Sequence, residues 1–291
     1  MKKLIAATSL VALATAGLSS AQSTSAAATV SPLGEVRAGE PMRLVYEVKA
    51  TAWALFIPIT GRANFRMDLQ PDTYSINGVV KTTGLADILV NYDMRLAASG
   101  YVRDDRLEPY AYVSQNRDGK KNRRVEMTYG ASDVAMTAKP AFGNLGEPPA
   151  TPAQKLEAAD PLTAFLGHAF TPRPADGNPC GEPMKIFDGR QLTHLHFENA
   201  GLKQVKTDAY RGEAYECHVS MDKIAGYDAD EINAKETLTG IEGPLRMWMA
   251  PMDNGTYMPV KIQADTDAIG SVTLQVSKLR YEPIPEPSNE G

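Results

Sequence analysis

The strongest helix signal in this chain is the segment DPLTAFLGHAF, residues 160–170. Asp160 is a favourable N-cap, and Pro161 occupies the first helical position, where its missing N–H costs no hydrogen bond. Apolar residues then follow at helical spacing, at Leu162, Phe165, Leu166 and Phe170. Strand-like patterns precede and follow this segment. We therefore expect one short apolar helix that buries its apolar stripe against the concave face of a curved sheet.

Most of the remaining chain alternates apolar and polar residues with a period of two, which is typical of half-buried strands. The runs Met42–Lys49 and Tyr215–Met221 show this alternation, and turn dipeptides such as Asp188-Gly189 and Asn254-Gly255 separate neighbouring runs. There are roughly a dozen such runs, and they do not alternate with helices. The pattern predicts a mainly β fold: a curved antiparallel sheet or open β-barrel of about a dozen strands, with one apolar helix packed on its concave face.

The first 21 residues have the three parts of a secretory signal peptide. Lys2 and Lys3 precede an apolar run over residues 4–18, and small residues lead to a cleavage site after Ala21. We expect export to the periplasm, with cleavage after Ala21. No later run approaches the roughly 20 apolar residues that span a bilayer, so we expect no transmembrane segment after cleavage.

The rest of the chain is expected to form one domain between two flexible ends. Residues 22–36 are rich in Ser, Ala and Thr and predict a flexible leader. Residues 285–291 are polar and predict a flexible tail. A β-rich chain of the remaining length can bury one core, so we expect a single β-rich domain over residues 37–284.

The charge balance of the chain argues against two classes of partner. The full sequence has 30 basic and 35 acidic side chains. A mildly acidic protein gives no electrostatic reason to expect nucleic acid, or an anionic membrane surface, as a partner. We therefore expect neither nucleic acid nor an anionic membrane surface as a partner.

The chain contains two cysteines, Cys180 and Cys217. An isolated pair in an oxidising compartment favours a disulfide over two free thiols. The alternative is a thiol nucleophile, and its only support is that His218 follows Cys217 directly. Neighbouring residues of a strand point to opposite faces, which argues against that catalytic pair.

Three segments of the sequence resemble one known family. They are the helix DPLTAFLGHAF, the hairpin MKIFDGRQLTHLHF and the later stretch LRMWMAPMDNGTYMPVKI. They are similar to a proteobacterial exported family, the domain-of-unknown-function family 3108. The resemblance implies a periplasmic β-rich fold similar in general shape to the Lol lipoprotein carriers, whose curved sheet holds a hydrophobic cavity closed by a helix. It implies no catalytic residues.

A cavity of this kind would be lined by large apolar side chains. Methionines gather around Trp248, and methionine adapts to irregular apolar ligands, although the same cluster is equally consistent with plain core. We expect the ligand-binding side chains to be Phe165, Leu166, Trp248 and Met249, with Trp53 and Phe56 at the rim.

A metal site is the weaker alternative. His194 and His196 lie two residues apart on a predicted strand and therefore point to the same face, and His218 could add a third ligand if its strand pairs with theirs. Solvent-facing imidazoles are the more ordinary interpretation, and His168 in the helix is expected to be packed or partly exposed. Since no serine-hydrolase elbow, zinc-protease or phosphate-loop motif occurs, we expect no catalytic residues, no metal and no cofactor.

The sequence therefore favours a non-enzymatic periplasmic protein that binds an apolar ligand, such as a lipid, an acyl chain or a lipoprotein, in support of the cell envelope. Envelope proteins are further candidate partners. A second hypothesis is an envelope scaffolding protein that acts through its sheet edges and has no sizeable cavity. A third is a metal-dependent hydrolase that uses His194, His196 and His218.

Overall fold

The computed structural model describes residues 39–54, 57–84, 92–103, 106–118, 122–173, 177–229, 241–253, 255–266 and 270–284. The predicted signal peptide, leader and tail lie outside these residues. So does Phe56, and for Trp53 only the backbone is described.

Strands dominate the described part of the chain. They are β1 (Met42–Ala54), β2 (Ile57–Leu69), β3 (Thr73–Thr83), β4 (Asp93–Arg103), β5 (Arg106–Asn116), β6 (Arg124–Tyr129), β7 (Val134–Lys139), β8 (Met184–Phe187), β9 (Leu192–Lys206), β10 (Arg211–Ala225), β11 (Ile241–Pro251), β12 (Tyr257–Thr266) and β13 (Gly270–Pro283). The helices are α3 (Pro152–Leu156) and α4 (Pro161–Phe170).

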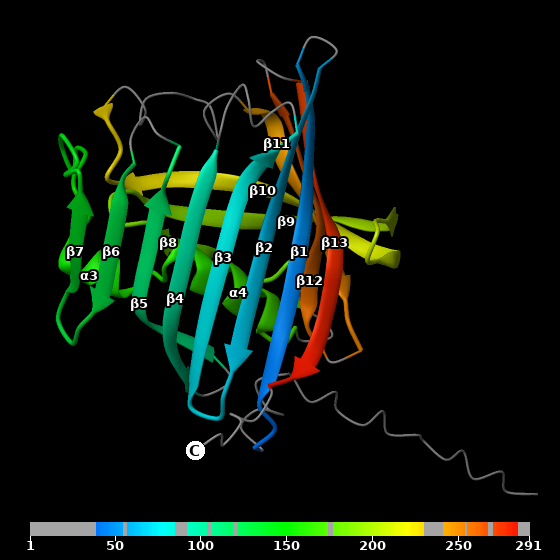
Figure 1. Ribbon diagram of the computed structural model, residues 1–291, viewed down its shortest axis with the longest axis horizontal. Helices are drawn as coiled ribbons and strands as arrows, with labels where there is room; N and C mark the ends of the chain where they lie inside the picture. Colours follow the sequence, from blue (N-terminus) through cyan, green and yellow to red (C-terminus); the bar gives the residue numbers. More distant parts are fainter. Residues whose placement is uncertain are drawn as a thin grey trace, which may run out of the picture.

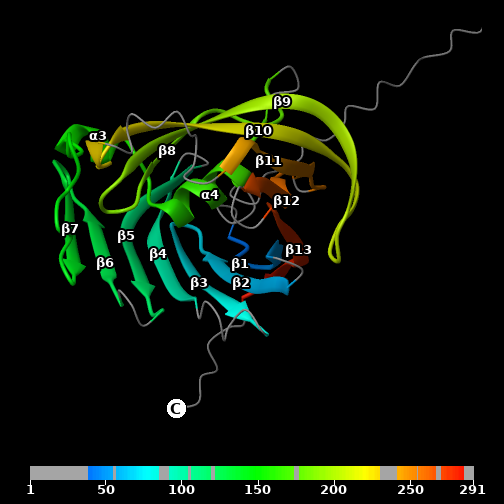
Figure 2. The same cartoon turned by 90° about the horizontal axis from the view of Figure 1, so that it is seen from above.

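All thirteen strands belong to one sheet, in the order β7-β6-β5-β4-β3-β2-β1-β13-β12-β11-β10-β9-β8. Neighbouring strands are antiparallel, and the first and last strands, β1 and β13, pair in the middle of the sheet. The sheet curls around α4, and β9 and β10 arch over the helix (Figures 1 and 2). The edges β7 and β8 are not paired with each other. The prediction of a mainly β, open barrel-like sheet with a helix on its concave face is confirmed.

Helix α4 begins and ends where the sequence predicts. The Asp160 carboxylate accepts hydrogen bonds from the N–H groups of Leu162 and Thr163, both at 3.0 Å, which makes it the N-cap. The short helix α3 was not expected, because it lies at the end of a loop dense in Pro and Gly. A capping box forms it: the Thr151 hydroxyl accepts from Gln154 N–H, and the Gln154 side chain accepts from Thr151 N–H.

The segment between α3 and α4 joins the helix to the edge strand β8. Ala159 pairs in parallel with Ile186, and Phe187 N–H donates to the Ala159 carbonyl at 2.9 Å. The N-terminus of α4 is therefore tied to the sheet by backbone hydrogen bonds and does not rely on side-chain packing alone.

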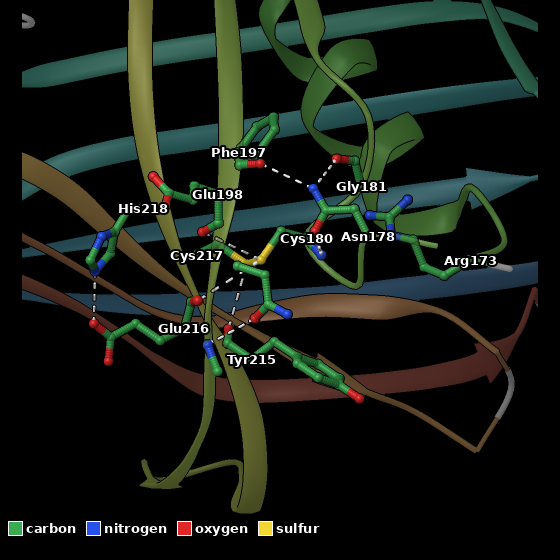
Figure 3. Close-up of a disulfide and its surroundings, with 12 residues drawn as sticks. Arg173, Asn178, Cys180, Gly181, Phe197, Glu198, Tyr215, Glu216, Cys217 and His218 are labelled. Carbon is green, nitrogen blue, oxygen red and sulfur yellow. Dashed lines mark hydrogen bonds and ion pairs between the residues drawn. A yellow bond between two sulfur atoms is a disulfide. The ribbon is translucent and has the colours of Figure 1, made fainter. Parts of the chain in front are cut away.

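The predicted disulfide is confirmed: Cys180 and Cys217 are bonded, with their Cα atoms 5.7 Å apart. The bond ties the loop after α4 to the inner face of β10 (Figure 3). Beside it, the Asn178 amide donates to the Phe197 carbonyl at 3.0 Å. Both ends of the helix are thus attached to the β8–β10 part of the sheet.

Candidate ligand cavity

An apolar cavity of about 310 Å³ lies between α4 and the concave face of the sheet. It is lined by Tyr46, Val48, Ala63, Phe65, Val80, Pro161, Leu162, Phe165, Leu166, Val260, Lys261, Ile262, Leu274 and Val276. The sheet residues come from β1, β2, β3, β12 and β13, and the helix residues follow one face of α4. Sequence segments more than 200 residues apart therefore meet in this cavity.

Strand register explains why these side chains share one face. Val48 of β1 lies opposite Ala63 of β2, and Ala63 lies opposite Val80 of β3. On the other side of β1, Val48 lies opposite Val276 of β13. Directly paired residues of antiparallel strands point to the same side of the sheet. The small Ala63 stands among larger neighbours and leaves room beneath the helix.

The helix closes this space with aromatic and aliphatic groups. The Phe165 ring lies 6.3 Å from the Tyr46 ring, centroid to centroid, and Tyr46 lies at the same distance from Phe65. Pro161, Leu162, Phe165 and Leu166 recur at helical spacing, so they form one stripe on the side of α4 that faces β1 to β3.

The polar atoms at the cavity wall are already occupied. The buried Tyr46 hydroxyl donates to the Pro259 carbonyl at 2.5 Å, and burial raises the pKa of Tyr46. Lys261 lies between Val260 and Ile262, whose side chains face inward. Because side chains alternate along a strand, the Lys261 side chain points to the opposite face. Its ammonium lies there, 4.4 Å from the centre of the Trp248 ring. Among the described lining residues, no charged side chain points into the cavity.

A second apolar space of about 270 Å³ continues the first one along the same inner face. The two share Ala63, Val80 and Leu274. The second space extends past Ala52 and Ile59, toward the end of β1 and the start of β2. Together they form an elongated apolar region, which suits a long, narrow ligand better than a compact one.

The structure brings only some of the predicted ligand-binding residues to this cavity. Phe165 and Leu166 line it. Trp248 does not: it pairs with Lys261, so it lies on the other face of the sheet, where it is 6 % exposed. Met249 is fully buried in a separate apolar cluster that contains the disulfide. The side chains of Trp53 and Phe56 lie outside the described residues.

Sequence reasoning missed most of the sheet residues that line the cavity. Val48, Val80, Leu274 and Val276 each belong to a run that predicts a strand, but no predicted run includes Ala63. The alternation does not say which strands lie beneath the helix, because that depends on pairing between distant segments.

The other side of α4 rests on a buried polar cluster. The Tyr74 hydroxyl lies 2.7 Å from the Thr163 hydroxyl, and Asp160 is fully buried beside them. Burial raises the pKa of Asp160 to about 6, although hydrogen bonds from Thr163 and Leu162 oppose that shift. Among the described residues, one Asp160 carboxylate oxygen, Oδ2, has no hydrogen-bond partner. Burial also raises the pKa of Tyr74. This cluster holds the helix in place and is not part of the apolar cavity.

His168 is packed, in agreement with one of the two predicted environments. Its ring stacks on Phe197 at 4.5 Å, and its Nε2 atom lies 2.8 Å from the Cys180 carbonyl. Because a carbonyl only accepts, Nε2 carries the proton and donates. Burial, together with the nearby charge of Arg173, lowers the pKa of His168 to about 4. The imidazole is therefore neutral near pH 7.

The three histidines of the metal hypothesis are not assembled into a site. His196 pairs with Asp222 at 2.8 Å, and His218 pairs with Glu216 at 3.1 Å. Within the described ranges, no three His, Cys, Asp or Glu side chains lie close enough together to hold a metal ion. The geometry does not support the metal-dependent hydrolase.

The fold and the cavity together define a β-rich cavity protein: an open antiparallel barrel with an apolar space under its inner helix. The family model described as "Protein of unknown function (DUF3108)" matches residues 45–277, and the chain belongs to that family. The family predicted from the three sequence segments is thus confirmed. In the described part of the chain, no helix is long and apolar enough to cross a membrane.

Two solved structures are similar to this chain. One is the β-barrel-like protein of domain of unknown function DUF1849 from Brucella abortus, with 11% identity, 84% of this chain and 98% of that chain covered, and a TM-score of 0.41. The other is a DUF1329 family protein from Desulfovibrio piger. It has 12% identity and a TM-score of 0.27, and the match covers 86% of this chain and 89% of that chain. No curated protein matches the sequence.

Proposed function

We propose that this protein is a non-enzymatic periplasmic binding protein that holds an acyl chain or a similar lipid tail in the cavity under α4, in support of the cell envelope. The observation that carries this proposal is the elongated apolar space between α4 and the concave face of β1, β2, β3, β12 and β13. A free lipid or the acyl group of a lipoprotein would both present such a tail.

The lining favours hydrocarbon over polar ligands. The Tyr46 hydroxyl already donates its proton to the Pro259 carbonyl, so it has no free proton to donate to a ligand. A polar group buried there without a partner would cost free energy, whereas each buried methylene contributes about 0.8 kcal/mol. The polar head of the ligand would therefore stay outside the cavity.

A periplasmic location is supported by two independent features. The first residues have the pattern of a secretory signal peptide. The Cys180–Cys217 bond is typical of proteins that fold in an oxidising compartment.

The proposal is tested by asking whether lipid is bound and where. The mature protein is purified from its own periplasm and measured by native mass spectrometry, followed by denaturing analysis of any released species. Fluorescent fatty acids are then titrated into delipidated protein. Co-purified lipid and saturable binding are the expected results.

A variant pair places the ligand in the cavity. Ala63→Leu fills the junction of the two apolar spaces and should weaken fatty-acid binding at least tenfold. Ala97→Leu makes the same change on β4, where Ala97 pairs with Asn77 on the outer face, and should leave binding unchanged. A protein that carries no lipid and binds no fatty acid would overturn the proposal and favour the scaffolding alternative.

A further inference from the structure

The outer, convex face of β1–β3 carries a row of exposed cations. Lys49 lies directly opposite Arg62, and Arg62 lies directly opposite Lys81. Lys49 forms an ion pair with Asp208 at the tip of the β9–β10 hairpin. Arg62 and Lys81 form no ion pair with another described residue, although Lys81 lies directly opposite Asp93 of β4. Adjacent strands lie about 4.8 Å apart, and like charges directly opposite each other are destabilising, so the row attracts anions.

The basic surface continues across the neighbouring strands. A shallow groove of about 740 Å³ crosses the outer face of β3–β6 and is lined by Arg95, Arg117 and Arg124 but by no carboxylate among the described residues. Two carboxylates stand beside it: Glu126 pairs with Arg124 at 2.6 Å, and Asp93 lies 3.9 Å from Arg95. The six exposed cations of the row and the groove form what we call the basic face.

The basic face lies directly behind the apolar region. Arg62 lies between Gly61 and Ala63 in the sequence, and all three border the second apolar space. Lys81 has the same position between Val80 and Thr82. The row of cations and the extension of the cavity are thus at the same level of β1–β3, and only the thickness of the sheet separates them.

We propose that the basic face docks onto an anionic phospholipid bilayer. The charges spread over several strands, as suits a surface of many phosphates better than one small anion. The exposed large apolar side chains of the described residues are Tyr110, Leu145, Leu156 and Leu202; Tyr110 lies on β5, but none of the four lines the groove or belongs to the row. The contact is therefore electrostatic, reversible and sensitive to salt.

Docking on a bilayer places the end of the apolar region close to membrane lipids, which are a source of acyl chains. That role of the basic face rests on the proposed function of the cavity. The overall charge of −5 gives no sign of this surface, which is why the sequence alone argued against an anionic membrane as a partner. The cations that form it come from separate strands and gather only through pairing.

The test is flotation of the mature protein with two kinds of vesicle: phosphatidylcholine alone, and an equimolar mixture of phosphatidylcholine and phosphatidylglycerol. We expect binding to the mixed vesicles only, falling as salt is raised. Each basic side chain near an anionic surface contributes about 1 kcal/mol, or roughly fivefold in affinity. The double variant Arg62→Gln/Lys81→Gln should therefore lose about 25-fold in affinity.

A matched control removes the same charge elsewhere. Lys203→Gln/Lys206→Gln changes two exposed lysines on β9 and should bind the mixed vesicles like the unaltered protein. Equal binding to neutral and anionic vesicles, or unchanged binding by the Arg62/Lys81 variant, would overturn the proposal. Binding to neither vesicle would also overturn it and point to an acidic protein instead.

The two proposals fail separately. The Arg62/Lys81 variant should still bind fluorescent fatty acids, because strand alternation sends both side chains to the outer face of the sheet, opposite the apolar region. Ala63→Leu should still float with anionic vesicles. Loss of fatty-acid binding with intact vesicle binding would reject the cavity alone, and the reverse result would reject the docking surface alone.

Discussion

The backbone of Gly146 lies against the backbone of Gly226, so closely that a Cβ atom on Gly146 would lie 2.2 Å from the Gly226 carbonyl carbon. Hydrogen bonds flank this contact: Glu147 N–H donates to the Tyr227 carbonyl at 2.9 Å, and Gly226 N–H donates to the Pro148 carbonyl at 2.8 Å. The loop after β7 is thereby fastened to the end of β10. This contact links the loop after the edge strand β7 to the β8–β10 part of the sheet, although β7 and β8 share no strand ladder.

Replacing Gly226 with Ala should unfold the protein at a much lower urea concentration. A Cβ there would lie 1.8 Å from the Arg190 carbonyl oxygen, and the residue has a φ of +81°. We expect a loss of about 3 kcal/mol or more. Gly201→Ala is the control, because Gly201 has a φ of +95° but no atom within 4 Å of an added Cβ. It should cost only about 1 to 2 kcal/mol. Equal losses would show that the close backbone contact is unimportant.

Removing the disulfide should destabilise the fold strongly. The bond joins residues 37 apart, and the chain-entropy model assigns about 4 kcal/mol to a loop of that size. The Cys180→Ser/Cys217→Ser variant should show this loss in urea unfolding. Unaltered protein in a thiol reductant should show the same loss, and the variant should not respond to the reductant. A reductant effect on the variant would mean that the bond is not the cause.

Asp160→Asn should change how stability depends on pH. The folded protein raises the pKa of Asp160 from 3.8 to about 6, so it binds a proton more tightly than the unfolded chain. The contribution of Asp160 to the free energy of unfolding of the wild type is therefore full below pH 3.8 and is lost as the pH rises through about 6.

The Asn variant keeps an oxygen that can cap α4, and it avoids the buried charge. Above pH 6 it should be more stable than the wild type by about 2 to 3 kcal/mol, a difference that vanishes below pH 3.8. Urea midpoints measured across this range test the prediction. A constant difference at every pH would contradict it.

His168→Gln should have the opposite pH dependence. The folded protein lowers the pKa of His168 from 6.5 to about 4, so the unfolded chain binds the proton more tightly. The contribution of His168 to the free energy of unfolding of the wild type is present above pH 6.5 and is lost as the pH falls through about 4.

Gln can still donate to the Cys180 carbonyl but does not titrate. The His168→Gln variant should be less stable than the wild type near pH 7, because it loses the stacking on Phe197. This deficit should shrink by about 3 kcal/mol as the pH falls from 6.5 to 4. Thermal unfolding at a series of pH values measures it, and a deficit independent of pH would refute the assignment of His168 as a buried neutral group.

Features that depend on neighbouring residues were predictable from the sequence. Asp160 and Pro161 mark the start of α4 through local hydrogen bonding, and the period of two marks the strands through side-chain direction. The Cys180–Cys217 pair was predictable because the chain offers no other partner for either cysteine. Family membership was predictable because the helix and the two later segments carry a recognisable pattern.

The cavity and the basic face were decided by the tertiary structure alone. Trp248 stands among methionines in the sequence and resembles a cavity residue, yet the pairing of β11 with β12 turns it to the outer face beneath Lys261. A shift of one residue in that register would reverse the faces of the whole strand. Ala63 and Arg62 are adjacent in the sequence, and because successive side chains of a strand alternate, they lie on opposite faces of the sheet. Alternation in the sequence defines two faces for each strand, but only long-range pairing decides which face covers the helix and which meets solvent.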